Sequence, residues 1–276
     1  THCETDPMIK ANEKVMREKY GDAIPIELHP IIRNEAQCFA STSLAVSLAK
    51  KHQATLHVLH ISTAEELALF NSSQPLTDKK ITAEVCVHHL WYDSRDYEKL
   101  GAQIKCNPAI KEERHKVQLL QALLDNKLDV IATDHAPHLW QEKYALTPDG
   151  KPDYFKSPSG LPLLQHSFNM MLEFYRQGKL SLEKIAEKMC HAPALLFKIK
   201  NRGFIREGYA ADLFILDPEH AYKVSKENIL YKCNWSPLEG TTFQGRITHT
   251  FVKGRLVYAN GVFDESVNGM RLEFDR

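Results

Sequence analysis

Apolar residues recur along the chain with two periods, one typical of helices and one typical of buried strands. Three short apolar runs rich in β-branched residues predict strands at 54–61, 81–87 and 128–134. Helical spacing surrounds these runs, and the expected helices span residues 7–20, 34–52, 64–71, 111–126, 161–177 and 181–198. Strands that alternate with helices indicate an α/β fold with a parallel sheet and right-handed crossovers.

The spacing becomes irregular in three places along the chain. A long loop is expected after the strand at 81–87. Residues 135–159 contain four prolines and one glycine, and this length and composition predict an active-site loop. From residue 203 onward, short runs interrupted by glycines predict a small all-β portion. We therefore expect two domains, residues 1–200 and residues 201–276.

Composition and charge exclude several classes of protein. Lysine and arginine together number 35, as do aspartate and glutamate, so no excess of positive charge favours nucleic acid or an anionic membrane surface. No apolar run reaches the roughly 18 residues that a membrane helix requires. The six cysteines are scattered without a CxxC pair, which is typical of reduced core cysteines in a cytoplasmic protein. The first residues, from Thr1, show no signal peptide and read as the end of a strand, so we expect a fragment or a processed chain.

Three ionisable residues follow strands, in the strings THCE, HVLHISTA and ATDHAPH. His2, His60 and Asp134 stand where a strand ends, which is the edge at which parallel sheets and barrels gather their chemistry. Imidazole nitrogens and a carboxylate oxygen suit zinc, and such a carboxylate can also carry a proton. Each residue also has a structural interpretation, a hydrogen-bonded rim histidine or a turn-capping aspartate. His57 is given that interpretation because strand alternation turns it to the face opposite His60.

With these motifs the chain resembles the amidohydrolase superfamily, and within it the dihydroorotases of the long-chain type, related to hydantoinases and allantoinases. The resemblance covers essentially the whole chain, and TDHAPH is its most specific string. It implies a TIM-type (β/α)8 barrel, of which only the second half lies in this chain, followed by a small C-terminal β-sandwich portion. His2, His60 and Asp134 match metal ligands of barrel strands five, six and eight, and Asp134 also matches the general acid and base.

The resemblance also implies substrate contacts. Asn107 in NPAIK matches an asparagine that hydrogen-bonds the dihydropyrimidine ring, although the family's second proline and arginine are replaced here. His138 matches a histidine that holds the substrate carboxylate, and Gly160 ends a loop whose amides face the ring. His88 and His89 occupy a PHHL-like position with Val87 in place of proline, and we assign both a structural or supporting role.

The function that the resemblance implies is the reversible hydrolysis of dihydroorotate to N-carbamoyl-L-aspartate in pyrimidine biosynthesis. Two divalent metal ions, zinc in first place, are expected, with a bridging carbamylated lysine or aspartate upstream of this chain. A cytoplasmic homodimer that acts on this small molecule, and on no nucleic acid or membrane, is expected. Two alternatives stay open: a hydantoinase, dihydropyrimidinase or allantoinase, and a non-catalytic scaffold relative.

Overall fold

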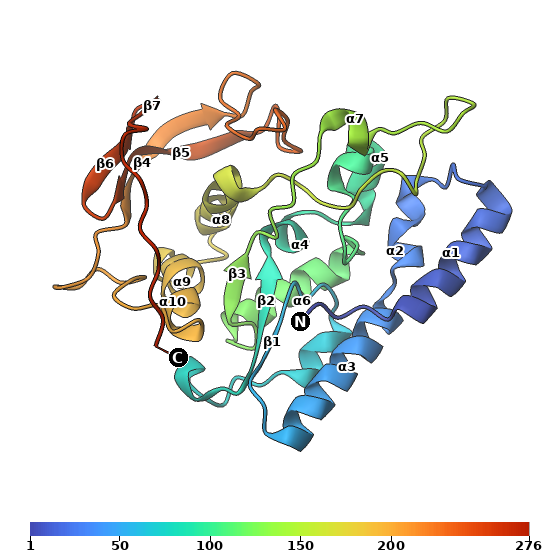
Figure 1. Cartoon of the computed structure of the whole chain (residues 1–276), viewed down its shortest axis with the longest axis horizontal. Coiled ribbons are helices and arrows are strands. Elements are labelled where there is room, and N and C mark those ends of the chain that lie inside the picture. Colours follow the sequence, from blue (N-terminus) through green and yellow to red (C-terminus); the bar gives the residue numbers. More distant parts are fainter. Residues whose placement is uncertain (276) are drawn as a thin grey trace. The chain divides into compact units, whose positions relative to one another are not determined.

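The computed structural model describes residues 1–275, which form two compact units (Figure 1). The first unit comprises residues 1–167 and 225–239. The second comprises residues 168–224 and the chain from Gly240 onward. The expected division into residues 1–200 and 201–276 stays a prediction.

A parallel sheet forms the centre of the first unit. Its strands are ordered β1-β2-β3 and span Leu56–Val58, Ile81–Cys86 and Val130–Ala132. Val58 is paired with Ala83, and Cys86 with Ala132, both in parallel register. The three predicted strands and their parallel arrangement are confirmed. Each strand is shorter than predicted, because the chain leaves the hydrogen-bonded ladder before it reaches His60 or Asp134.

The first unit contains helices as well as this sheet. They are α1 (Asp6–Tyr20), α2 (His29–Ile32), α3 (Glu35–His52), α4 (Val87–Trp91), α5 (Tyr97–Leu100), α6 (Glu113–Leu124) and α7 (Trp140–Lys143). Asn34 caps α3, as expected, by accepting a hydrogen bond from the backbone amide of Gln37 (3.4 Å). The helix expected at 64–71 is only a 3-10 turn, Glu65–Leu69. The long loop expected after β2 is wrong, because α4 and α5 lie there together with 3-10 turns at Ser94–Asp96 and Gly101–Ile104.

The helices pack on the sheet in chain order. Helix α3 packs against β1, and α4 packs against both β2 and α6. An apolar cluster connects α1 and α2 to Tyr154, and Ile9, Ile24 and Ile32 are buried in it. Tyr154 belongs to the expected active-site loop 135–159, so this loop is anchored in the core of the first unit.

The second unit combines helices with an antiparallel sheet. Its helices are α8 (Ser167–Arg176), α9 (Leu182–Ala186) and α10 (Ala192–Leu196), with a π-helical turn at Glu187–His191. Its strands β4 (Leu213–Lys223), β5 (Thr242–Val252), β6 (Arg255–Ala259) and β7 (Val262–Phe263) pair in sequence order. Asn169 of α8 donates to the carbonyl of Gly245 in β5 (3.0 Å). The predicted all-β tail is present, whereas the helix expected at 161–177 starts only at Ser167.

Within residues 1–275, no helix is both long enough and apolar enough to span a lipid bilayer.

Candidate active site

The first residues of the chain lie alongside β1. The amino group of Thr1 donates to the carbonyl of His57 (2.7 Å), and the amide of Leu59 donates to the carbonyl of Thr1 (3.1 Å). This pairing carries His2 to the carboxyl end of the sheet. There His2 Nδ1 lies 2.6 Å from His60 Nε2, so two imidazoles far apart in sequence face each other.

His60 has the protonation state that a metal ligand needs. Its side chain is buried, and loss of hydration, together with the neighbouring imidazole of His2, lowers its pKa from 6.5 to about 4. The ring is therefore neutral at pH 7. Nε2 faces His2, while Nδ1 is buried and has no hydrogen-bond partner among residues 1–275.

Asp134 follows β3 and is exposed. Partial loss of hydration raises its pKa, the imidazole of His2 acts in the opposite direction, and the carboxylate of Glu84 raises it further. Asp134 therefore lies within electrostatic reach of His2. Its carboxylate does not form a tight group with the two rings: among the described residues, the sets of three metal-ligand atoms within 4.8 Å of one another are Cys86–His88–His89 and Glu35–Glu112–His115.

Glu84 is a residue of this edge that the sequence reasoning missed. One carboxylate oxygen contacts Nε2 of His57 (3.0 Å), and the other accepts from the backbone amide of His60 (3.4 Å). The alternation argument for His57 therefore does not apply, because β1 ends at Val58 and His60 lies beyond the strand. His57 keeps a structural role, since Thr82 binds its other ring nitrogen (2.9 Å). The sequence did contain a signal for Glu84, because a carboxylate stands inside the otherwise apolar run ITAEVCV.

The structure brings together the segments that carry the expected substrate contacts. A Cβ placed on Gly160 would lie 3.2 Å from Cδ2 of His138, so these two residues are neighbours. The amide of Gly160 donates to the carbonyl of Lys105 (2.8 Å), two residues before Asn107. The side-chain oxygen of Asn107 is buried and lacks a partner among residues 1–275. An unpaired buried acceptor suits a ligand that offers an N–H group.

Two buried lysines and a histidine hold the Gly160 segment in place, and the sequence analysis identified none of them. Lys143 Nζ donates to the carbonyls of residues 105, 158 and 160 at 2.8–3.0 Å. Lys105 Nζ donates to the carbonyls of Tyr154 (2.5 Å) and Ser157 (2.6 Å). His135 Nδ1 accepts from the amides of residues 163 and 164. A lysine in a polar segment is normally predicted to be exposed to solvent. The sequence therefore gave no signal that these two lysines are buried.

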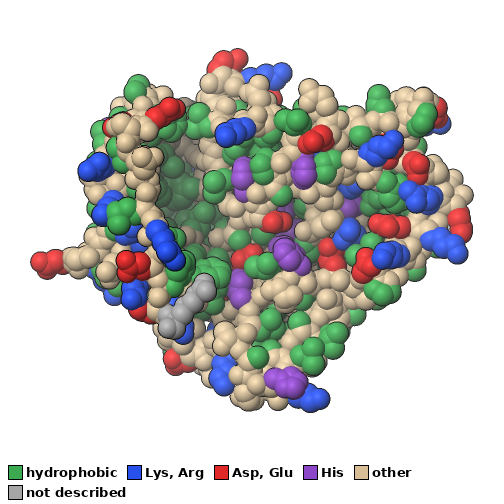
Figure 2. Space-filling view, viewed as in Figure 1, with side chains coloured by type: hydrophobic (Ala, Val, Ile, Leu, Met, Phe, Trp, Pro, Cys, Tyr) green, Lys and Arg blue, Asp and Glu red, His purple; other side chains and the backbone are tan. Residues whose placement is uncertain are grey.

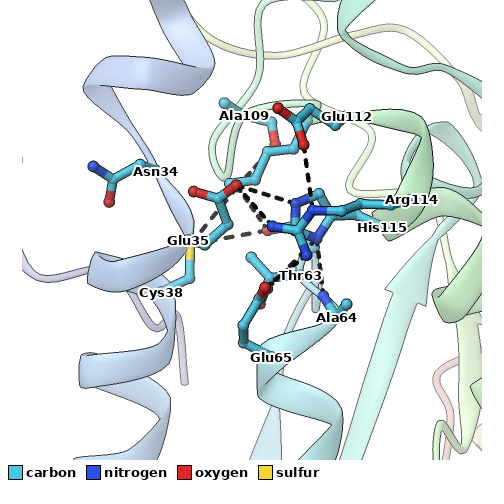
Figure 3. A network of polar contacts seen from close by, with 12 residues as sticks. Asn34, Glu35, Cys38, Thr63, Ala64, Glu65, Ala109, Glu112, Arg114 and His115 are labelled. Carbon is cyan, nitrogen blue, oxygen red and sulfur yellow. Dashed lines mark hydrogen bonds and ion pairs between the residues drawn. The ribbon is translucent and has the colours of Figure 1, made fainter.

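The acidic set Glu35–Glu112–His115 is an ion-pair network rather than a cation site (Figure 3). Arg114 contacts carboxylates of Glu35 (3.3 Å), Glu65 (2.7 Å) and Glu112 (3.3 Å). His115 Nδ1 accepts from the amide of Ala64 (3.0 Å). The guanidinium already supplies the positive charge that a metal ion would bring. Figure 2 shows histidine side chains at several separate places on the face that it draws.

Comparison with known proteins finds relatives that match most of the chain. The family model described as "Amidohydrolase family" matches residues 37–257. Proteins named dihydroorotase from Carboxydothermus hydrogenoformans and Methanosphaera stadtmanae are 34% and 28% identical to it over 94% and 93% of the chain. An L-hydantoinase from Arthrobacter aurescens superposes with a TM-score of 0.84 at 27% identity over 95% of the chain. The chain covers 57% of the length of each of these three proteins.

Proposed function

Because the chain belongs to the amidohydrolase family, whose solved relatives have a TIM-barrel type of fold, we propose that it works as part of a dihydroorotase. The reaction is the reversible hydrolysis of dihydroorotate to N-carbamoyl-L-aspartate. In this proposal the chain corresponds to the second half of the barrel, residues 1–200, and to part of a small β-sandwich, residues 201–276. The protein acts in the cytoplasm as a homodimer.

One observation carries the proposal: the contact between His2 Nδ1 and His60 Nε2 at 2.6 Å. The two residues come from different segments, and both stand at the carboxyl end of the parallel sheet. His60 is neutral at pH 7, because its pKa is lowered to about 4 by burial and by His2. Two converging imidazoles, with the carboxylate of Asp134 within electrostatic reach of His2, are ligand types that zinc accepts. His2, His60 and Asp134 would hold divalent metal, with further ligands from the longer protein.

The side chains of this edge have distinct roles in the proposed reaction. When bound, the metal ions would polarise the ring carbonyl and lower the pKa of the attacking water. Asp134 accepts the proton of that water and delivers it to the departing ring nitrogen; its raised pKa favours this exchange. Asn107 and the amides near Gly160 hold the ring. His138 orients the substrate carboxylate, which reduces the entropy cost of reaching the transition state.

A hydantoinase-type activity is the second candidate, because the L-hydantoinase of Arthrobacter aurescens shares the fold at 27% identity. The two activities differ in whether the ring carries a carboxylate. His138 discriminates between them, since its half-buried ring lies beside Gly160 and can pair with that carboxylate.

The test compares two substrates in the full-length protein. We expect metal-dependent turnover of dihydroorotate that a chelator abolishes and zinc restores. In His138→Ala, KM for dihydroorotate should rise at least about tenfold more than KM for dihydrouracil, because only dihydroorotate loses a charge-assisted hydrogen bond. His52→Ala, at the exposed end of α3, is the matched control. Equal losses on both rings contradict the role of His138, and turnover of hydantoin without dihydroorotate favours the second candidate.

A further inference from the structure

A second set of metal-ligand atoms lies at the junction of β2 and α4. Cys86 is the last residue of β2, and His88 and His89 lie in the first turn of α4. Their side chains are 0%, 1% and 4% exposed, and one ligand atom of each lies within 4.8 Å of the others. None of the three belongs to the metal site of the proposed function, so this inference goes beyond that function.

His89 is oriented as a metal-bound histidine is. Its Nε2 lies 3.0 Å from the carbonyl oxygen of Pro108 and must donate to it, because a carbonyl only accepts. In the neutral ring Nδ1 therefore carries a lone pair. That atom is buried and has no hydrogen-bond partner within residues 1–275. A histidine ligand characteristically donates its second ring N–H to a carbonyl or carboxylate, and this bond fixes the tautomer that binds metal.

His88 lacks partners altogether. Both of its ring nitrogens are buried, and neither makes a hydrogen bond to any residue that the structure describes. A buried polar atom that stays unpaired costs about 1–3 kcal/mol. The ring lies against that of His89, with ring centroids 4.2 Å apart. This concentration of unused acceptor atoms in the protein interior points to a ligand that takes electron pairs.

Cys86 adds a sulfur atom to these nitrogens. Its thiol is fully buried, and burial together with the carboxylates of Glu84 and Asp134 raises its pKa. The same two negative charges favour a cation beside the sulfur. A divalent cation replaces the thiol proton, so binding of one ion forms one metal–sulfur bond and releases one proton.

We propose that Cys86, His88 and His89 bind one zinc ion, at a site separate from that of His2, His60 and Asp134. One thiolate and two neutral imidazoles are ligands that zinc accepts, and three protein ligands leave a fourth position for water or another group. The spacing Cys-x-His-His is possible because β2 ends at Cys86 and the chain turns at once into α4, so one ligand atom of each residue lies within 4.8 Å of the others.

Cobalt substitution of the full-length protein distinguishes this site from the other one. Thiolate bound to Co²⁺ gives a charge-transfer band in the near ultraviolet, whereas imidazole and carboxylate ligands alone do not. We expect this band in the unmodified protein and its loss in Cys86→Ser, together with one equivalent of metal. Cys38→Ser is the matched control, because Cys38 is equally buried but contacts the hydroxyl of Ser62 (3.9 Å) and the ammonium of Lys111 (3.8 Å). It should keep both the band and the metal content.

X-ray absorption at the zinc edge tests the unmodified protein without relying on a variant that could misfold. Sulfur in the zinc coordination shell, at about 2.3 Å, is expected. A shell of nitrogen and oxygen alone overturns the proposal, as does a cobalt band that survives in Cys86→Ser. Neither measurement depends on hydrolysis, so the proposed function and this zinc site can fail independently.

Discussion

His60 and Asp134 share an uncommon backbone conformation, with φ values of 41° and 43°. Non-glycine residues adopt positive φ in only a few per cent of cases, and such positions concentrate at functional sites. Both residues stand immediately after a strand of the parallel sheet. In each case the left-handed turn ends the regular ladder and redirects the side chain at the edge of the sheet. Two independent outliers at equivalent positions support a shared functional role.

The carboxylate of Asp134 is the group on which the proposed proton transfer depends. In the full-length protein we expect Asp134→Asn to lower kcat at least about 10³-fold, because an amide cannot carry the proton and adds no negative charge for metal. Asp125→Asn is the control, since Asp125 is exposed at the C-terminal end of α6 and accepts from Gln121 (2.9 Å). A loss below about tenfold in Asp134→Asn removes this residue from the role of proton carrier.

Gly160 has no room for a side chain. Its φ is 148°, and a Cβ would approach the carbonyl oxygen of Ala136 to 2.4 Å and the Cβ of Ala136 to 2.8 Å. Gly160→Ala must therefore move the backbone that lies beside His138. We expect a loss of about 1–3 kcal/mol in the free energy of unfolding and a higher KM for dihydroorotate.

Gly150→Ala separates conformational strain from this close contact. Gly150 also has positive φ, 82°, but nothing lies within 4 Å of its Cβ position. Urea unfolding and KM should show a smaller stability loss and an unchanged KM for Gly150→Ala. If both variants behave alike, the proximity of Gly160 to Ala136 and His138 has no functional consequence.

At the scale of elements, the apolar runs predicted the three parallel strands, because buried strands need continuous apolar residues. They overestimated strand length, since β-branched and apolar residues continue into the turns that carry His60 and Asp134. Helix α4 was missed because the string VHHLW extends the apolar run of β2 and has no N-cap signal. The approach of His2 to His60 depends on long-range pairing. Local sequence patterns predicted only that these residues stand at strand ends. Their assignment as metal ligands came from the resemblance to the amidohydrolase superfamily.

The buried lysines were unpredictable for a related physical reason. A lysine is normally exposed, and only the folded loop gathers enough carbonyl groups around an ammonium to compensate for its lost hydration. Lys143 is 0% exposed, and burial lowers its pKa to about 7. Its three carbonyl partners join α7 to the segment around Gly160 and to residue 105. Lys143 thus orders the loop between α7 and α8 together with Lys105, which donates to the carbonyls of Tyr154 and Ser157.

Lys143→Met should therefore loosen this loop. Three carbonyl groups each lose a donor, and among residues 1–275 only that of Lys105 keeps another, the amide of Gly160, so we expect the free energy of unfolding to fall by about 2 kcal/mol. Lys156→Met is the matched control in the same loop, because its exposed ammonium forms an ion pair with Asp153 (3.2 Å) worth about 0–1 kcal/mol. Urea denaturation and limited proteolysis of residues 144–159 measure both effects. Equal stability of the two variants contradicts an ordering role for Lys143.

At the scale of the whole molecule, acid stability depends on histidines that the fold keeps neutral. His29 is fully buried and accepts from the Tyr154 hydroxyl (2.8 Å), while its other nitrogen donates to the carbonyl of Cys106 (2.8 Å). Burial lowers its pKa well below 6.5. His166 is also buried, and loss of hydration lowers its pKa to about 4. Both pKa values are depressed in the folded state, so the unfolded chain takes up protons first as the pH falls.

The difference between the folded and unfolded pKa values sets the sign of the change in stability with pH and the pH range over which it occurs. Between the unfolded pKa of 6.5 and the folded pKa of about 4, His166 should lower the free energy of unfolding by about 1.4 kcal/mol for each pH unit of acidification. His166→Gln removes this contribution, so its urea midpoints should fall less steeply between roughly pH 6.5 and 4.5 than those of the unmodified protein. The exposed His52→Gln should leave the slope unchanged. Parallel slopes in His166→Gln and His52→Gln would show that the pKa of His166 does not change on unfolding, because only a group whose pKa changes on unfolding contributes to the slope.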